Sequence, residues 1–374
     1  MSELEGPGPG PRSPSPAARV AFWAGPVLFL AAVFISSRAG DATLTPEAIR
    51  LLGATAWMAL WWVSEVVPIA ATSMLPLALF PLFGIGSMKA AAASYMHPLV
   101  VLLMAGFMVA LALERWELHR RLALRVLAAV GTSPRRLILG MMIACALCSM
   151  WISNTATTLV MLPIGMALVA RAREREPDRG PEVAAFATAL FLGLAYAANV
   201  GGLGTPIGTP PNLVMLGIYE KAFPDADPIT FLDWMMMACP LVIVFVPAIW
   251  LYLTRVAHPV ADALDMGSGE LVAEERATMG PMNRDALTTA LIFALVALLW
   301  ITRAIKVGDG TVMGWAPALG VAADVNDATV AVFGALLLFS WPAKTRPGER
   351  LLDWDTARAL PWAVLLLFGG GFYW

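Results

Sequence analysis

Charged residues are scarce in this sequence. Only 14% of its 374 residues are Asp, Glu, Lys or Arg, whereas soluble domains carry about 25%. Hydrophobic residues make up 59%, and the mean hydropathy is +0.72. A water-soluble fold of this length cannot bury so much apolar surface, so the composition predicts an all-α polytopic membrane protein. It excludes a nucleic-acid-binding protein and a secreted disulfide-rich module, and the net charge of −2 favours no class of partner.

Cysteine is rarer still. The three cysteines, Cys145, Cys148 and Cys239, all lie in apolar stretches. Cys145 and Cys148 form a C-x-x-C motif, but no His or acidic residue stands beside it. We therefore predict that these two thiols pack in a core and take no part in redox chemistry or metal binding.

Long apolar runs dominate the rest of the chain. Residues 1–18 are rich in Pro, Gly and Ser, which predicts a disordered tail. The run at 20–36 that follows predicts a first transmembrane helix rather than a signal peptide, because many more runs come after it. These further runs lie roughly at 51–70, 72–86, 97–114, 137–170, 183–219, 232–253, 286–302, 328–342 and 360–374.

Two of these runs are too long for one membrane crossing. No charged residue occurs at 137–170, a stretch of 34 residues, or at 183–219, a stretch of 37. A helix of 34 residues would reach about 51 Å at roughly 1.5 Å per residue, whereas the hydrocarbon core of a bilayer is about 30 Å thick. Each run must therefore be broken.

Positive charge predicts how the first run is broken. Six arginines precede it at 115–136, and four follow it at 171–179. Since cytoplasmic segments are enriched in Lys and Arg, both flanks should be cytoplasmic. A re-entrant hairpin of two half-helices at 137–170 would enter and leave on that side. With a cytoplasmic N-terminus, 19 of the 25 Lys and Arg residues fall on cytoplasmic segments and 6 on external ones.

A weak internal repeat accompanies this topology. HPLVVLLMAGF at 97–107 resembles LPWAVLLLFGG at 360–370, so that Pro98 matches Pro361 at an offset of 263 residues. The predicted topology runs the two copies in opposite directions across the membrane. Inverted repeats of this kind are typical of secondary transporters.

Polar residues gather where each long run must break. SMWISNTATT at 149–158 carries five hydroxyl groups and an Asn, and ANVGGLGTPIGTPPN at 198–212 carries four Gly and three Pro. Hydroxyl groups often only bond their own helix, and a Gly-rich stretch can be a packing seam. Three prolines in six residues and an Asn at a turn indicate instead non-helical backbone that lines a polar cavity. Carbonyl and hydroxyl oxygens there suit Na⁺, and half-helix N-termini favour an anionic substrate.

These motifs resemble the divalent anion/sodium symporter family, which takes up di- and tricarboxylates. The resemblance extends over nearly the whole chain after the tail. Its most specific parts are SNTATTLVMLPI at 153–164 and GGLGTPIGTPPN at 201–212. The other parts are WWVSEVVPIAATSMLP at 61–76, GFMVALALERWELHRRLAL at 106–124 and LPWAVLLLFGGGF at 360–372.

The resemblance implies the residues of a binding site. It implies a sodium site shared by the hairpin and an unwound helix, with the ligands Ser149, Ser153, Asn154 and Gly208. It implies that the substrate carboxylates contact Asn154, Thr155 and Thr209, with Pro210 beside them. Glu65, in the motif at 61–76, stands near a predicted helix end, where we favour a structural role over substrate contact.

The family has two copies of the hairpin and the broken helix, and the second hairpin would lie beyond residue 374. The resemblance therefore implies an inverted-repeat fold whose second repeat is truncated at the C-terminus. The expected segments are a cytoplasmic tail at 1–18, scaffold helices at 19–131, the first half of a transport domain at 132–254, a cytoplasmic loop at 255–285 and the start of the second repeat at 286–374. Within the transport domain, we expect the hairpin at 137–170, the broken helix at 183–219 and a further helix at 232–253.

The resemblance implies sodium-coupled symport of dicarboxylates of the succinate, malate and fumarate class. It implies a homodimer in the cytoplasmic membrane, an elevator-like mechanism and Na⁺ as the co-transported ion. Three alternatives stay open: a truncated and transport-inactive fragment, a permease for sulfate or another inorganic anion, and an intramembrane hydrolase that uses Ser149 or Ser153. The hydrolase is disfavoured because the three histidines are distant in sequence and supply no general base, so we predict a transporter and not an enzyme.

Overall fold

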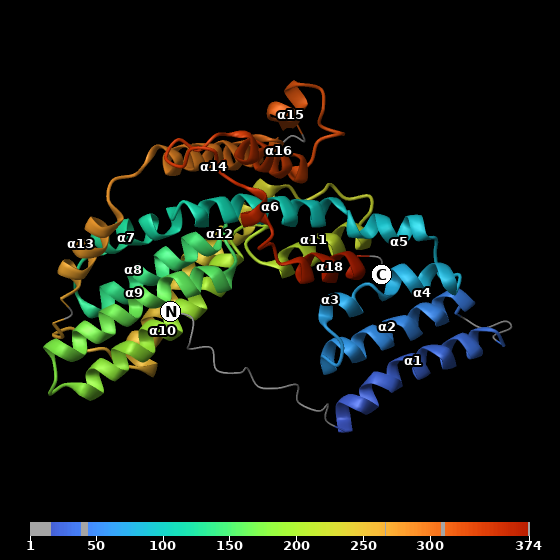
Figure 1. The fold of residues 1–374 in the computed structure, drawn as a ribbon, viewed down its shortest axis with the longest axis horizontal. Coiled ribbons are helices and arrows are strands. Elements are labelled where there is room, and N and C mark those ends of the chain that lie inside the picture. The colour runs from blue at the N-terminus through green and yellow to red at the C-terminus, as the bar shows by residue number, and fades with distance from the viewer. Residues whose placement is uncertain (1–15, 39–43, 266, 308–310, 373–374) are drawn as a thin grey trace. The chain divides into compact units, whose positions relative to one another are not determined.

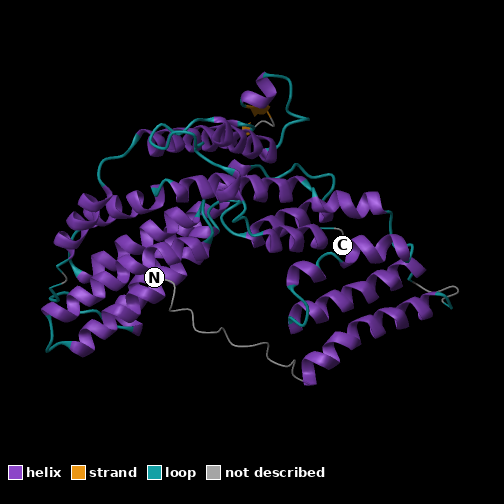
Figure 2. Ribbon diagram, in the orientation of Figure 1, coloured by secondary structure: helices purple, strands orange, loops and turns teal. Residues whose placement is uncertain are grey.

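The computed structural model describes residues 16–38, 44–265, 267–307 and 311–372. It divides into two compact units, each with its own hydrophobic core. Unit 1 comprises the described residues up to 100 together with 361–372, and unit 2 comprises those at 101–360. Figures 1 and 2 show that almost every regular element in the described ranges is a helix. Most of the predicted tail, residues 1–15, lies outside the described residues.

Unit 1 consists of helices alone within the described ranges. Their bounds are α1 (Pro16–Ser36), α2 (Pro46–Ser64), α3 (Ile69–Thr72), α4 (Leu75–Leu82), α5 (Met88–Tyr95) and α18 (Trp362–Gly371). Helix α6 (Pro98–Arg115) begins at the boundary and continues into unit 2. Both copies of the internal repeat thus form a helix that starts at or directly after the matched proline, Pro98 in one copy and Pro361 in the other.

Unit 2 holds the remaining helices and the small sheet. The helices are α7 (Leu118–Val130), α8 (Pro134–Ser149), α9 (Asn154–Arg175), α10 (Gly180–Gly202), α11 (Pro210–Ala222), α12 (Phe231–Tyr252), the π-helix η1 (Leu253–Ala257), α13 (Ser268–Met279), α14 (Arg284–Thr302), α15 (Trp315–Ala318), α16 (Asp327–Ser340) and α17 (Trp354–Ala357). Strands β1 (Ile305–Val307) and β2 (Thr311–Met313) pair antiparallel, with Lys306 opposite Val312.

The helices confirm the predicted fold class, an all-α polytopic membrane protein. Six helical stretches among the described residues are long and apolar enough to cross a membrane. They are Pro16–Ser36, Met88–Arg115, Asn154–Arg175, Gly180–Gly202, Phe231–Ala257 and Arg284–Thr302. Three other apolar runs of the sequence form shorter helices, at Ile69–Leu82, Asp327–Ser340 and Trp362–Gly371.

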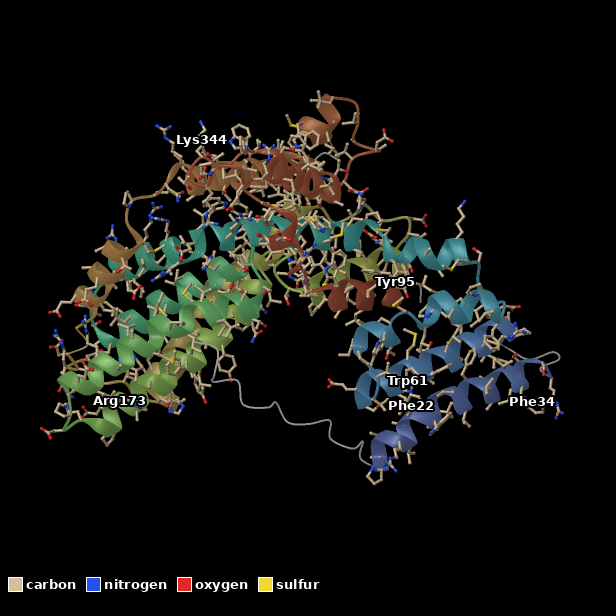
Figure 3. The ribbon with its side chains drawn as sticks, in the orientation of Figure 1. Phe22, Phe34, Trp61, Tyr95, Arg173 and Lys344 are labelled. Atoms are coloured by element: carbon tan, nitrogen blue, oxygen red, sulfur yellow. The ribbon has the colours of Figure 1, made fainter. Side chains whose placement is uncertain are left out.

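In unit 1, close helix packing depends on aromatic and small residues. Figure 3 shows Phe22 of α1 beside Trp61 of α2, and their rings stack with centroids 5.5 Å apart. The indole nitrogen of Trp61 also donates to the Phe22 carbonyl oxygen. At the other side of this unit, the Tyr95 hydroxyl donates to the Ser73 carbonyl at 2.5 Å. A Cβ on Gly370 of α18 would lie 2.6 Å from the same Ser73 oxygen, so only glycine allows this approach.

In unit 2, both charge-free runs are broken, as their length requires. Helix α8 ends at Ser149 and α9 begins at Asn154, while α10 ends at Gly202 and α11 begins at Pro210. Helices α8, α9 and α10 pack side by side (Figure 1), and their buried side chains form the largest apolar cluster described in this unit. The membrane side from which the α8–α9 hairpin enters stays a prediction.

The base of this hairpin is clamped by the segment predicted as a cytoplasmic loop at 255–285. Arg135 of α8 binds Asp262 at 2.8 Å, Arg171 of α9 binds Glu274 at 3.0 Å, and Arg175 binds Asp265 and Glu270 at 2.8 and 2.5 Å. Apolar residues of the loop and of α13, such as Val260 and Leu271, pack onto the hairpin core. The arginine-rich flanks and this loop therefore lie together, which the predicted topology requires of segments on one side of the membrane.

A second docked segment lies at the C-terminal end of α6. Arg115 pairs with both Glu349 and Asp353, and the Trp116 indole nitrogen donates to the Leu351 carbonyl at 2.8 Å. Asp353 caps α17 by accepting from the Thr356 amide at 2.8 Å. Burial alone would raise the pKa of Asp353, but the hydrogen bonds from Thr356 and Arg115 outweigh it and lower the pKa to about 2.

We expect Asp353→Asn to remove part of the acid sensitivity of unit 2. Because the folded-state pKa lies below the usual value, the Asp353 charge stabilises the fold above about pH 4 and loses this effect as the pH falls toward 2. Asn keeps the capping oxygen but not the charge. The variant should therefore lose about 1 kcal/mol of unfolding free energy at pH 6, a figure that allows for solvent screening. Thermal unfolding at pH 6 and pH 3 measures it. The exposed Asp355→Asn is the matched control, and equal pH dependence of the two variants would contradict the prediction.

Candidate functional site

The tip of the α8–α9 hairpin is a tight turn at residues 150–153. The Trp151 and Ile152 amides both donate to the Cys148 carbonyl, which closes the end of α8. Ser153 is the N-cap of α9, and its hydroxyl accepts from the Ala156 amide at 3.2 Å. Serine at this position satisfies one of the free amides of the first helical turn. The tip thus brings a helix C-terminus and a helix N-terminus together.

The break between α10 and α11 has the same plan. Residues 203–209 are not helical, because Pro206 and Pro210 remove backbone donors and disfavour helix before them. The buried Asn212 closes the break from the far side, where its Nδ2 donates to the carbonyl oxygens of Gly202 and Thr205, each at 2.8 Å. Thr209 is the N-cap residue of α11. A second pair of helix ends therefore meets here.

Hydrogen bonds join the tip to the break. The Thr205 hydroxyl donates to the Met150 carbonyl. The Ser149 Oγ lies 2.6 Å from the Asn154 Oδ1 and 2.7 Å from the Ala198 carbonyl oxygen. Asn154 Nδ2 in turn donates to the Oδ1 of Asn199 at 3.1 Å. We call this set of contacts between residues 149–154 and 198–212 the junction.

Two glycines allow the junction to close. A Cβ on Gly208 would lie 2.5 Å from the Gly202 oxygen and 3.0 Å from the Met150 oxygen, so two carbonyl groups converge on this position. A Cβ on Gly202 would lie 2.6 Å from Asn154 Oδ1. Any side chain at either position would push the tip away from the break.

The structure brings some of the predicted site residues into direct contact. Ser149 and Asn154 touch, and Gly208 lies next to carbonyl groups of both the tip and the break. Ser153 is at the tip but acts as a helix cap. The other three predicted contacts are at the adjoining helix starts: Thr155 is exposed in the first turn of α9, and Thr209 and Pro210 begin α11. In the described part of the chain, no side-chain hydrogen bond joins these three to Asn154.

Sequence reasoning missed three polar residues of the junction: Asn199, Thr205 and Asn212. All three belong to the quoted motif at 198–212, and each interrupts an otherwise apolar or Gly/Pro-rich segment. Thr205 and Asn212 are buried, and a buried polar side chain requires a hydrogen-bond partner. They find theirs on the tip and on the backbone of the break, whereas the exposed Asn199 accepts from Asn154 on the tip. The sequence therefore marked these three residues as polar positions within the motif, but it did not show which groups they would bond.

The junction contains more acceptors than donors. A serine hydroxyl has one hydrogen, so Ser149 can donate to Asn154 Oδ1 or to the Ala198 carbonyl but not fully to both. When it donates to Ala198, the Ser149 and Asn154 oxygens face each other at 2.6 Å with no proton between them. Such a pair of oxygens is stabilised by a hard cation, whose ligands in proteins are hydroxyl, amide and carbonyl oxygens.

The four helix ends give the junction two electrostatic characters. The C-terminal ends of α8 and α10 bring carbonyl groups and partial negative charge, which favours a cation. The N-terminal ends of α9 and α11 bring free amides and partial positive charge, which favours an anion. Asn154 belongs to both regions, because its amide group carries an acceptor and donors.

Aromatic rings of α12 and α14 support the tip. Trp151 stacks near Phe231 of α12, with ring centroids 6.1 Å apart, and meets Phe293 of α14 edge-on at 4.9 Å. Phe231 stacks closely on Trp300 at 4.5 Å. The tip is thus packed against α12 and α14, and ligand-induced movement of the tip would have to slide over this stack.

Two other sequence predictions have clear outcomes. Cys145 and Cys148 are almost fully buried and unpaired, and they belong to the apolar core around the hairpin, which confirms the packing role. Glu65 is the C-cap of α2, with a left-handed φ of 48°, and its side chain is exposed. Glu65 therefore lies at a helix end, the position that the sequence predicted for it.

Residues 59–374 match the citrate transporter family. The chain belongs to that family. Membership confirms the resemblance to the divalent anion/sodium symporter family. The chain is also similar to proteins named sodium-dependent dicarboxylate transporter SdcS, with 38% identity to that of Staphylococcus saprophyticus and 37% to that of Staphylococcus aureus. Each similarity extends over 350 residues, which is 93% of this chain and 65% of the relative.

The close packing of α10 against α8 can be tested at Gly201. A Cβ there would overlap the backbone of Ala146, which cannot move as a side chain can. We expect Gly201→Ala to destabilise the fold by about 1–3 kcal/mol. Thermal unfolding in detergent measures this loss. Gly180→Ala, on the same helix with no atom within 4 Å of the new methyl group, is the control, and equal melting temperatures for both variants would refute the packing argument.

Proposed function

We propose that this protein carries out sodium-coupled symport of dicarboxylates, with Na⁺ and the substrate bound at the junction. The observation that carries the proposal is the contact of Ser149 and Asn154 at the tip with the helix break, in a chain of a transporter family. The names of the Staphylococcus relatives support the same ion and substrate class. Because the chain spans 65% of these relatives, the activity, substrates and partners of the whole protein are part of the proposal.

Na⁺ would bind on the side of the helix C-termini. Its proposed ligands are Ser149, Ser153, Asn154 and the backbone of Gly208. Ser149 and Asn154 already present two oxygens 2.6 Å apart, and carbonyl groups of Gly202 and Met150 converge beside Gly208. A cation would take the place of the single shared proton and relieve the surplus of acceptors.

The dicarboxylate would bind on the side of the helix N-termini. Asn154 Nδ2 has a second hydrogen beyond the one given to Asn199, and the Thr155 and Thr209 hydroxyl groups stand at the starts of α9 and α11, with Pro210 next to them. With Na⁺ on Oδ1 and a carboxylate on Nδ2, the planar amide of Asn154 would link the two ligands. Binding of Na⁺ would then fix the donor for the anion, which couples the two sites.

Transport would follow an elevator-like cycle in the cytoplasmic membrane. We propose that the hairpin and the broken helix move as one loaded body against the scaffold helices of a homodimer, with the N-terminus in the cytoplasm. The ion pairs between the hairpin base and the 255–285 loop support movement of these segments together. The arginine-rich flanks of the hairpin support their assignment to the cytoplasmic side.

Uptake by the purified chain in proteoliposomes tests the function. We expect labelled succinate to accumulate with an inward Na⁺ gradient and not with an equal K⁺ gradient. Asn154→Ala should lower uptake at least 10-fold, because it removes a contact to both ligands. Thr188→Ala is the matched control, since that exposed hydroxyl only bonds its own helix. Uptake of sulfate but not succinate, or succinate uptake independent of Na⁺, would contradict the proposal.

Sodium binding can be tested without transport. Na⁺ should raise the melting temperature relative to choline, because a ligand that binds only the folded state stabilises it, and Ser149→Ala should abolish the increase. We also expect Asn199→Ala to weaken Na⁺ about 3- to 10-fold, since Asn199 orients the Asn154 amide. An unchanged Na⁺ titration in Asn199→Ala would assign that residue to packing only.

A further inference from the structure

A cavity lined by arginines lies between α7, α13 and the start of α14. Its volume is about 380 Å³. Its basic lining residues are Arg121 and Arg125 of α7 and Arg276 of α13, and its apolar ones include Leu124, Met279 and Met282. This basic cavity shares no residue with the junction.

The ends of two spanning helices set the depth of the basic cavity. Met282 lies two residues before α14, which begins at Arg284. Arg121 lies six residues after the end of α6 at Arg115. Both helices are apolar and long enough to cross the membrane. The ends of such helices lie at the boundary between hydrocarbon and headgroups. The basic cavity therefore lies at headgroup level.

No acidic side chain lines the cavity to balance its charge. The acids of the adjoining turns, Glu117 and Glu275, pair with Arg120 instead, at 3.4 and 2.5 Å. Among the described residues, Arg121, Arg125 and Arg276 form no ion pair. Arg121 is held in place by the backbone oxygens of 279–281, at 3.0 to 3.3 Å, which orient its guanidinium without neutralising it.

We propose that the basic cavity binds the phosphodiester of an anionic phospholipid headgroup. Guanidinium groups bind phosphate oxygens through paired hydrogen bonds, and a basic pocket beside spanning helices on the arginine-rich face is a favourable place for such a headgroup. The apolar side chains of Leu124, Met279 and Met282 would contact the glycerol and the first acyl carbons. Free phosphate shares this anionic chemistry but would leave these apolar contacts unused.

Lipid titration of the purified chain, followed by native mass spectrometry, tests the proposal. The probes are phosphatidylglycerol and phosphatidylcholine, with and without 10 mM inorganic phosphate (roughly the concentration at which a weak anion site fills). We expect phosphatidylglycerol to bind more tightly than phosphatidylcholine, and Arg125→Gln/Arg276→Gln to weaken it roughly 10- to 30-fold. Arg173→Gln/Arg358→Gln removes the same charge from exposed positions outside the cavity and should change binding less than about 2-fold.

A variant that keeps the positive charge separates a specific loss of lipid binding from a loss caused by misfolding. Arg125→Lys/Arg276→Lys keeps the charge at these exposed positions but not the paired hydrogen bonds, so it should bind phosphatidylglycerol more tightly than the Gln variant and less tightly than the unchanged chain. Complete competition by inorganic phosphate, with loss of that competition in the Gln variant, would support the phosphate site but assign it to a soluble anion. Equal binding of the two lipids without any phosphate effect, or equal losses in the Gln variant and its control, would overturn the proposal.

Discussion

The structure of unit 2 depends on one constraint: a charge-free run longer than a bilayer is thick must break, and the backbone groups freed at the break need partners without help from bulk water. Side chains of the broken runs and of α12 supply these partners. Asn212 binds the Gly202 and Thr205 carbonyls, Thr205 binds the Met150 carbonyl, and the Trp234 indole nitrogen binds the Leu203 carbonyl. The polar residues that attract attention in the sequence are therefore first of all structural.

This requirement separates structural polar residues from those free to bind ligands. Asn212 and Thr205 are buried, and their hydrogen bonds hold the backbone of the break and the tip. Asn154 is only half-buried, and the oxygen it presents faces another oxygen, that of Ser149. A group with an incompletely satisfied acceptor pair in an otherwise satisfied junction is the natural place for a cation. In the proposed function, cation binding would thus centre on these two residues and not on the whole polar motif.

Length, charge and composition were sufficient to predict the helical fold, both breaks and a turn inside the polar segment at 149–158, whereas Ser149 and Asn154 were placed together in one site only by the family resemblance. The turn itself guarantees that neighbourhood, because the two residues are five positions apart. Asn199, Thr205 and Asn212 could not be assigned in this way. Their partners depend on how far α10 slides along α8, which close contacts such as that of Gly201 with Ala146 determine. For residues 255–285, the sequence predicted only that they lie on the same side of the membrane as the hairpin base. It could not predict which arginines of the hairpin pair with which acids of this loop, because that depends on packing.

The two ends of the hairpin are held by different interactions, and this difference bears on coupling. At the base, several ion pairs and a continuous apolar core join α8 and α9 to the 255–285 loop, which includes α13. Each exposed pair contributes little alone, but the buried contacts beneath them make the base the rigid end. At the tip, a few hydrogen bonds and the Trp151 ring contacts maintain the position. Each such hydrogen bond contributes about 1 kcal/mol, which is comparable to the coupling free energy that one bound ion typically supplies. The tip is consequently the part of the hairpin that an ion bound as proposed at Ser149 and Asn154 would order while the base stays unchanged.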